Sequence, residues 1–331
     1  MNTSKHPHRE NCDCGCAGRE NESGNEPEDL FPPEELITVR DWLRYAVSRF
    51  NRAGIHCGHG VDNTYDEAAW LILATLALPL ERLEPFLDAC LPSGERLALF
   101  KNIEYRAVER IPTAYLVNEA WLGSYRFYVD ERVIVPRSYF AELLEERFAP
   151  WIEDPETVAC ALDLCTGSGC LAVVMADAFP KADIVAADLS AEALAVAQRN
   201  VDDYGLGERV ELLQSDLFSA FDGRRFELIV CNPPYVTAEA MANLPPEYLH
   251  EPTLALAAAD DGLDAIRRLL AKAARHLYPK GLLVVEVGHN RHLVENAFPG
   301  LPFTWISTRG GEDGVFLLRR EDLPKPPENP R

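Results

Sequence analysis

The stretch TVACALDLCTGSGC, residues 157–170, contains in succession an apolar run, a glycine-rich turn and the start of a helical pattern. The apolar run, residues 157–164, is typical of a buried strand. Gly167 and Gly169 allow the tight turn that follows and let a ligand approach the backbone closely. The helix that begins there offers backbone N–H groups that lack partners within the helix. We therefore expect a strand, a ligand-binding turn and a helix.

Strand and helix patterns alternate through the rest of the C-terminal half. Helical segments separate the first five predicted strands, which favours a parallel sheet with right-handed crossovers. The last two strands are joined by the short segment TRGGEDG, so we expect an antiparallel hairpin at one edge of the sheet. The fold class is therefore α/β. The predicted strands are residues 157–164, 183–188, 210–215, 228–231, 281–287, 303–307 and 315–319.

The remaining sequence predicts four further segments. Residues 1–33 are polar and lack apolar periodicity, which predicts a disordered tail. Residues 34–119 are mainly helical in pattern and predict a small domain, which we expect to recognise the substrate. Residues 120–137 have the alternation and aromatic content of a β-hairpin that would link this domain to a catalytic domain over residues 138–323. Residues 324–331 form a C-terminal tail.

Composition and charge narrow the classes of function. No apolar run approaches the roughly 20 residues that span a bilayer, and the polar N-terminus lacks a signal peptide, so we expect a cytoplasmic protein. The chain of 331 residues has 32 basic and 53 acidic side chains and a net charge of −21. This charge repels a phosphate backbone and favours a basic partner. A nucleic-acid substrate is disfavoured, although a local basic patch would be compatible with this balance.

The nine cysteines do not predict a disulfide framework. Their number is odd, and several fall in or beside predicted core strands, which favours reduced thiols. The tail motif CDCGC, with Cys12, Cys14 and Cys16 preceded by His6 and His8, has two interpretations. A soft-metal site is one, but the spacing lacks a second ligand pair at a zinc-site distance, which favours a variable tail. We therefore predict no metal.

Two carboxylates follow predicted strands. Asp188 ends the second strand about 20 residues beyond the glycine turn, where an acidic side chain can accept hydrogen bonds from both hydroxyls of a ribose. The alternative is that Asp188 caps the helix that starts near Ser190. Asp216, in SDLF after the third strand, is placed to accept from the exocyclic amine of adenine; capping or loop solvation is the alternative. Together they favour a cofactor that contains a nucleoside.

The segment IVCNPPYV, residues 229–236, ends the fourth strand abruptly. Consecutive prolines remove backbone donors, so the chain must leave the sheet there as a stiff turn. The Asn232 side-chain oxygen and the Pro233 carbonyl are two acceptors on this turn, and Tyr235 supplies a flat wall. An amide nitrogen has a delocalised lone pair, so methylation requires that its hydrogens be held and its lone pair aimed at the methyl group. The turn is suited to that task.

The combination of DLCTGSGC, AADLS, SDLF and CNPPY resembles methyltransferases that use S-adenosyl-L-methionine, specifically the protein N(5)-glutamine methyltransferase family. The motifs IPTAYL at residues 111–116, FYVDERVIVPRS at residues 127–138 and HEP at residues 250–252 are also similar to that family. The resemblance covers residues 34 to 323. It implies a Rossmann-like class I S-adenosylmethionine-dependent methyltransferase fold with a small N-terminal helical domain.

Two bacterial branches of this family differ in their substrate. One methylates the GGQ glutamine of peptide release factors, and the other methylates a glutamine of the third protein of the large ribosomal subunit. Release-factor enzymes usually have a second proline after the PR dipeptide, whereas Ser138 follows Arg137 here. This departure, with WLGSYRFYVDERV and the GHGVDN stretch at residues 58–63, is similar to the ribosomal branch. The implied partner is a basic large-subunit ribosomal protein.

The resemblance also implies roles for individual residues. S-adenosyl-L-methionine carries an electrophilic methyl group, so the chemistry requires no metal. The expected catalytic residues are Asn232, Pro233 and Tyr235. The expected cofactor-binding residues are Asp163, Thr166, Gly167, Gly169, Asp188, Asp216, Leu217 and Asn232. The expected substrate-binding residues are Asn232, Pro233, Pro234, Tyr235 and Phe127, of which Phe127 also fits the core of the hairpin.

Three alternatives to the ribosomal-protein enzyme stay open. One is a release-factor glutamine methyltransferase. Another is a methyltransferase for amino groups of rRNA or DNA, because NPPY-type turns also serve exocyclic amines; the net charge of −21 counts against it. A third is a nonenzymatic assembly factor that keeps the fold, against which the intact Asn232 and the glycine turn argue.

Overall fold

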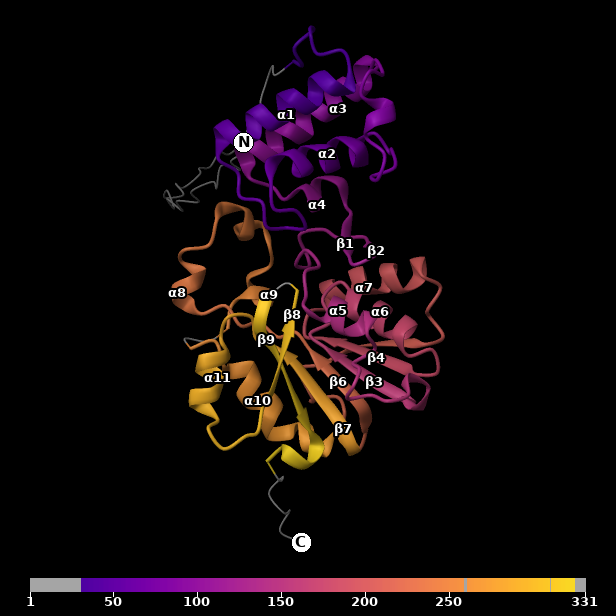
Figure 1. Cartoon of the computed structure of the whole chain (residues 1–331), viewed down its shortest axis with the longest axis vertical. Coiled ribbons are helices and arrows are strands. Elements are labelled where there is room, and N and C mark those ends of the chain that lie inside the picture. Colours follow the sequence, from indigo (N-terminus) through magenta and orange to yellow (C-terminus); the bar gives the residue numbers. More distant parts are fainter. Residues whose placement is uncertain (1–30, 259–260, 310, 325–331) are drawn as a thin grey trace, which may run out of the picture.

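A helical domain and an α/β domain make up the computed structural model, which describes residues 31–258, 261–309 and 311–324 (Figure 1). In the helical domain, Thr38 caps the first helix in a capping box and Asn63 caps the second. Trp42 and Phe50 are fully buried among these helices. The four α-helices of this domain are α1 (Val39–Ala53), α2 (Thr64–Thr75), α3 (Ser93–Glu104) and α4 (Thr113–Val117).

The second domain is built on a seven-stranded sheet with the order β5-β4-β3-β6-β7-β9-β8. The strands β3 to β7 are parallel, and β9 and β8 run antiparallel at one edge. The predicted α/β class and the predicted edge hairpin are therefore confirmed. The strands are β3 (Cys160–Leu164), β4 (Asp183–Asp188), β5 (Val210–Gln214), β6 (Phe226–Cys231), β7 (Leu277–Glu286), β8 (Thr304–Thr308) and β9 (Gly311–Arg319).

Helices cover both faces of this sheet (Figure 1). One face packs on α5 and α6 and the other packs on α10 and α11, and each face has its own cluster of buried apolar side chains. Strands that are covered on both faces have continuous apolar sequences, which is the pattern from which these strands were predicted. The helices are α5 (Phe140–Glu145), α6 (Cys170–Ala178), α7 (Ala191–Asp203), α8 (Ala238–Met241), α9 (Thr253–Leu256), α10 (Asp264–Lys272) and α11 (Arg291–Ala297).

The order of the strands reverses between β3 and β6. From β3 the chain goes to β4 and β5 on one side of the sheet, and then to β6 and β7 on the other. Such a switch point leaves a crevice at the carboxyl ends of the two central strands, where ligands bind in open α/β sheets. Leu164 and Cys231 are partners in the β3–β6 register, so the glycine turn and the NPPY turn begin side by side.

The predicted linking hairpin is shorter than the sequence suggested. Its paired strands are only β1 (Ala120–Leu122) and β2 (Tyr125–Phe127), joined through Gly123 in the left-handed region. Residues 128–136 are not strand, because their apolar side chains pack in a separate cluster with Tyr115 instead of pairing. The Tyr115 hydroxyl donates a hydrogen bond to the Val133 carbonyl at 2.6 Å.

Two sequence predictions concern membranes and the tail. Within the described ranges, no helix combines the length and the apolarity needed to cross a bilayer. The CDCGC motif lies outside the described residues. In the part of the chain that the structure describes, no cluster of three or more His, Cys, Asp or Glu side chains is arranged so that it could hold a metal ion.

Candidate active site

The glycine turn after β3 carries the first half of the site. Gly167 and Gly169 have φ angles of 55° and 77°, which a side chain would disfavour. A Cβ at Gly169 would also lie 3.0 Å from the Cβ of Ala197, so glycine permits the close approach of α6 and α7. Thr166 donates its hydroxyl to the Asp163 carboxylate at 2.5 Å. The turn is thus held by its own side chains.

Asp188, at the end of β4, is tied to the same turn. One carboxylate oxygen accepts from the Gly167 N–H at 2.9 Å and the other accepts from the Ser190 N–H at 2.9 Å. The N-cap of α7 is Ser190, whose hydroxyl accepts from the Ala193 N–H at 3.1 Å. The capping role that the sequence left open for Asp188 therefore belongs to Ser190. Asp188 is available to position the turn and to accept from a ligand.

Both carboxyl groups at this turn have raised pKa values. Burial raises the pKa of Asp163 to about 7, and the nearby charge of Asp188 acts in the same direction. Burial also raises the pKa of Asp188, although the N–H groups of Ser190 and Gly167 oppose that shift. Among the described residues, Asp163 Oδ1 has no hydrogen-bond partner. This oxygen can accept from a donor group on a ligand, such as an ammonium.

Asp216 and Leu217 follow β5, as predicted. Leu217 is buried and has a φ of 49°, a left-handed conformation that costs a leucine on the order of 1 kcal/mol or more. The Ser215 hydroxyl donates to the Leu217 carbonyl at 2.7 Å and helps to hold this turn. The Asp216 carboxylate is half-exposed and pairs with Arg268. An adenine amine would therefore compete with Arg268 for that carboxylate.

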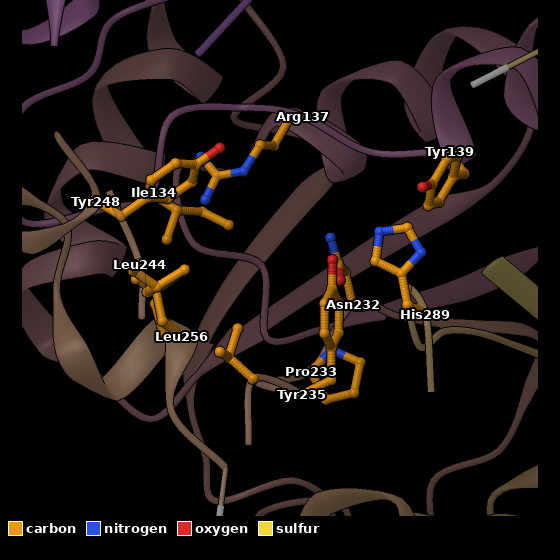
Figure 2. A pocket seen from close by; sticks show the side chains of 13 residues that line it. Ile134, Arg137, Tyr139, Asn232, Pro233, Tyr235, Leu244, Tyr248, Leu256 and His289 are labelled. Carbon is orange, nitrogen blue, oxygen red and sulfur yellow. The ribbon is translucent and has the colours of Figure 1, made fainter. Parts of the chain in front are cut away.

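The NPPY turn forms the second half of the site, beside a cavity of about 260 Å³ (Figure 2). Asn232, Pro233 and Tyr235 line this cavity, whereas Pro234 does not. The Tyr235 carbonyl accepts from Asn290 Nδ2 at 2.6 Å. The Tyr235 ring lies so close to Gly288 that a Cβ there would be 2.7 Å from the ring. The turn and its aromatic wall are consequently fixed.

Glu286, which ends β7, is a buried carboxyl group behind Tyr235. It accepts from the Ser138 hydroxyl at 2.5 Å, from the Tyr139 N–H at 3.1 Å and from the Tyr235 hydroxyl at 3.4 Å. Burial raises the pKa of Glu286 to about 7, and the hydrogen bonds from Ser138 and Tyr139 oppose this shift. Glu286 thus connects Tyr235 of the NPPY turn to Ser138 and Tyr139, and Tyr139 also lines the cavity.

Arg137 lines the opposite part of the cavity and is paired with Glu251. Its two terminal nitrogens donate to the two Glu251 oxygens at 2.5 and 2.6 Å. Burial would raise the pKa of Glu251, but the nearby His59 side chain and the hydrogen bonds from Arg137 lower it to about 2. The Glu251 carboxylate is thus charged at neutral pH, and the pair brings HEP to the segment that carries the PR dipeptide.

The structure brings most of the predicted site residues together at two turns; Asp216 and Leu217 lie apart at the turn after β5, and Pro234 does not line the cavity. Asp163, Thr166, Gly167, Gly169 and Asp188 come together at one turn. Asn232, Pro233 and Tyr235 come together at the neighbouring cavity. Phe127 is not brought there: it is 1% exposed and packs in the core beside the Tyr204 ring. It occupies the core position that the sequence had offered as the alternative.

Several residues of the site were missed by sequence reasoning. They are Arg137, Tyr139, Tyr248, Glu251, Glu286, Gly288, His289 and Asn290. A signal for some of them existed, because Gly288, His289 and Asn290 directly follow the fifth predicted strand, and neighbouring parallel strands end at the same edge of the sheet.

Comparisons with known proteins identify a matching family model. A family model described as "Methyltransferase small domain" matches residues 148–298. With the mixed seven-stranded sheet and the N-terminal helices, this match confirms the predicted class I methyltransferase fold. Among solved structures, the ribosomal protein L11 methylase from Lactobacillus delbrueckii subsp. bulgaricus aligns with a TM-score of 0.40 at 20% identity, covering 58% of this chain and 82% of that chain.

Curated relatives align with this chain over most of its length. A protein from Neisseria gonorrhoeae named "Ribosomal protein uL3 glutamine methyltransferase" is 58% identical over 290 residues, which cover 88% of this chain and 97% of that protein. A protein of the same name from Burkholderia pseudomallei is 52% identical and covers 88% and 97% of the two chains. One from Bordetella pertussis is also 52% identical, with the same coverage.

Proposed function

This chain belongs to the family of ribosomal protein uL3 glutamine methyltransferases, and on that premise we propose that it methylates the side-chain amide nitrogen of a glutamine in uL3. The methyl donor in this proposal is S-adenosyl-L-methionine. The partner is a basic protein, which suits a chain with a net charge of −21. The reaction takes place in the cytoplasm, where ribosomal proteins are modified.

The residues at the glycine turn fit this donor. The turn has left-handed glycines, leads directly into α6 and carries a carboxylate oxygen of Asp163 that has no partner among the described residues. Gly167 and Gly169 would leave room for the donor, Asp163 would accept from its ammonium group, and Asp188 would accept from its ribose hydroxyls. When bound, the donor supplies a methyl group made electrophilic by the sulfonium.

The residues of the NPPY turn would prepare the amide for attack. The Asn232 side-chain oxygen and the Pro233 carbonyl accept the two N–H groups of the glutamine amide, and the Tyr235 ring lies against its plane. These contacts fix the nitrogen and direct its lone pair. The amide needs no strong base before attack, because its proton becomes acidic only as the new bond forms. That fits a turn without a histidine or carboxylate of its own.

One observation carries this proposal. Leu164 and Cys231 are register partners, so the turn that would hold the donor and the turn that would hold the amide start next to each other at the switch point of the sheet. The alternatives have less support. The three relatives described above all carry the uL3 name, which disfavours release factors. The net charge of −21 disfavours rRNA and DNA.

A competition assay tests the proposal. Wild-type protein is incubated with methyl-labelled S-adenosyl-L-methionine and equal amounts of uL3, a peptide release factor and rRNA. We expect the label in uL3 at a rate far above that in the other two. A faster reaction with the release factor or the RNA would show that this molecule, and not uL3, is the preferred substrate. No transfer to any of the three would favour the nonenzymatic alternative.

A further inference from the structure

The helical domain packs behind two of the side chains that line the cavity. Residues 55–60, which connect α1 to α2, include the first half of the GHGVDN stretch that set this chain apart in sequence. Nothing in the proposed mechanism uses this loop. Its contacts nevertheless reach two side chains that line the cavity, Arg137 and Tyr248.

Tyr248 is held by the loop through direct packing. The centroid of its ring lies 4.5 Å from that of His59 and 5.7 Å from that of His56. A Cβ at Gly58 would lie 2.6 Å from the Tyr248 hydroxyl oxygen and 2.9 Å from His56 Nε2, both closer than such atoms approach. Gly58 therefore leaves the space that the Tyr248 hydroxyl and the His56 ring occupy.

Arg137 is held through Glu251, whose side chain is fully buried. Glu251 accepts both terminal nitrogens of Arg137 and the Val135 N–H at 2.9 Å. His59 Nε2 lies 3.6 Å from the same carboxylate, and His59 is only 2% exposed. The Arg137 guanidinium also lies over the Tyr248 ring, at 5.2 Å from its centroid. The loop, Glu251, Arg137 and Tyr248 therefore form one packed unit.

This unit faces the cavity from the side opposite the NPPY turn. Figure 2 shows one group of side chains, Ile134, Arg137, Leu244, Tyr248 and Leu256, across from another, Asn232, Pro233, Tyr235 and His289. The first group is mainly apolar apart from the guanidinium. Within the described ranges, Arg137 Nε has no hydrogen-bond acceptor, and the side chain is 30% exposed. It can therefore donate to a carbonyl oxygen that enters the cavity.

We propose that the loop of residues 55–60 is a specificity-determining part of the site: Gly58 and His59 position Tyr248 and Arg137, which contact the protein chain that flanks the target glutamine. The apolar side chains pack against that chain and Arg137 donates to one of its main-chain carbonyls. Gly58 and His59 are positioning residues, because they act through Tyr248 and Glu251. This inference rests on the proposed function and adds the surface that selects the protein around the amide.

The test uses the full chain and a double-mutant cycle. Gly58→Ala places a methyl group against the Tyr248 hydroxyl and should raise the KM for uL3 at least about tenfold, with an unchanged Kd for S-adenosyl-L-methionine. Tyr248→Phe removes the oxygen with which that methyl group collides. Gly58→Ala should therefore raise the KM by a smaller factor in the Tyr248→Phe background than in wild type, where the methyl group meets both Tyr248 and His56. Gly94→Ala is the matched control, because nothing lies within 4 Å of a Cβ at that glycine in α3.

His59→Gln provides a second variant that leaves Gly58 intact, and it should also raise the KM for uL3. The inference is overturned if both Gly58→Ala and His59→Gln keep the wild-type KM, or if the effect of Gly58→Ala is the same with and without the Tyr248 hydroxyl. If wild-type protein and Gly94→Ala do not methylate uL3 at all, the proposed function fails and the inference falls with it.

Discussion

At the scale of single residues, the site depends on acceptors that cannot move. Asn232 stands directly after a buried strand, and the prolines that follow limit the backbone conformations of the turn. Asn290 and Gly288 fix Tyr235 from behind. A preorganised acceptor loses little entropy when the substrate binds, which is how a turn without an acid or base can accelerate a reaction.

Substitution of Asn232 should separate chemistry from cofactor binding. Asn232→Ala removes an acceptor that holds the amide but leaves the glycine turn and Asp188 intact. We expect turnover to fall by about two orders of magnitude or more while the Kd for S-adenosyl-L-methionine stays nearly unchanged. Isothermal titration and a methyl-transfer assay on the same preparations measure the two quantities. Near-normal turnover would remove Asn232 from the mechanism.

Substitution of Asp188 should have the opposite effect. Its carboxylate accepts from the Gly167 N–H, and we expect it to bind the ribose equally well before and during the reaction. Asp188→Ala should raise the KM for S-adenosyl-L-methionine about tenfold to a hundredfold, as for loss of charged hydrogen bonds, with little change in saturated turnover. A loss of saturated turnover with an unchanged KM would place Asp188 outside the ribose site.

Glu286 should make the stability of the protein depend on pH. Burial raises its pKa from 4.5 to about 7, so the folded state binds this proton more tightly than the unfolded state. The stabilisation is complete below the unfolded pKa and is lost as the pH rises through the folded pKa. The side chain of Glu286→Gln cannot ionise. The free energy of unfolding of this variant minus that of wild type should therefore increase by on the order of 2 kcal/mol as the pH rises from about 4.5 to 7.5.

Urea unfolding of both proteins at about pH 4.5 and pH 7.5 measures this difference. Asp163 contributes the same pH dependence to both, so it cancels in the comparison. A difference between the two proteins that does not change with pH would show that Glu286 keeps an ordinary pKa in the folded protein.

At the scale of secondary-structure elements, the site arises because parallel strands end at one edge. The sequence allowed the strands, the glycine turn, Asp188 and NPPY to be predicted, since each depends on local patterns of apolar residues, glycine and proline. Glu251 and Glu286 could not be found in this way. Glu251 pairs with Arg137 across 114 residues and Glu286 binds Ser138 across 148, and no local pattern encodes such contacts.

The shortened hairpin has a similar origin. The alternation of apolar residues after β2 suggested a strand. Alternation shows only that one side of the segment is buried, and here the buried side packs on α4 without pairing with another strand. Phe127 is a further case, because the sequence pattern of a buried aromatic residue near a site does not distinguish contact with a ligand from packing in the core. Tertiary packing decided both.

The contact between the helical domain and the loop after NPPY includes a buried ionic network. Arg106 donates to Glu67 at 2.7 Å and to Glu247 at 3.2 Å, and all three side chains are 1% exposed. Arg106→Met would leave two buried carboxylates without this partner. We expect the free energy of unfolding to fall by about 3 to 5 kcal/mol, as for other broken buried pairs.

The matched control is Arg40→Met, which breaks the exposed ion pair with Asp88. The two side chains are 58% and 86% exposed, so the expected loss is below about 1 kcal/mol. Denaturant unfolding of the two variants beside wild type measures both losses. Equal small losses would show that the network contributes little to holding the domains together.

At the scale of the whole molecule, the balance of charge and the two-domain layout concern the encounter with uL3. The chain has 21 more acidic than basic residues, and ribosomal proteins are basic. The helical domain lies over the carboxyl edge of the sheet (Figure 1), and its loop of residues 55–60 packs against Tyr248, which lines the cavity. We therefore propose that residues 34–119 take part in recognition of the substrate and are not only a scaffold.

This arrangement predicts a salt-dependent reaction. Raising the salt concentration from about 50 to 300 mM screens attraction between exposed opposite charges, so kcat/KM for uL3 should fall severalfold. The Kd for S-adenosyl-L-methionine, measured over the same range, is the control and should change much less. A kcat/KM that is independent of salt would rule out electrostatic attraction as part of recognition.

The most direct measurement of the central claim is the position of the transferred methyl group. Purified uL3 that lacks the modification is incubated with the wild-type protein and S-adenosyl-L-methionine, and its fragments are sequenced by tandem mass spectrometry. We predict one methyl group on the side-chain amide nitrogen of a single glutamine, absent when Asn232→Ala replaces wild type over the same time. A methyl group on any other residue type, or equal labelling by the variant, would contradict the account.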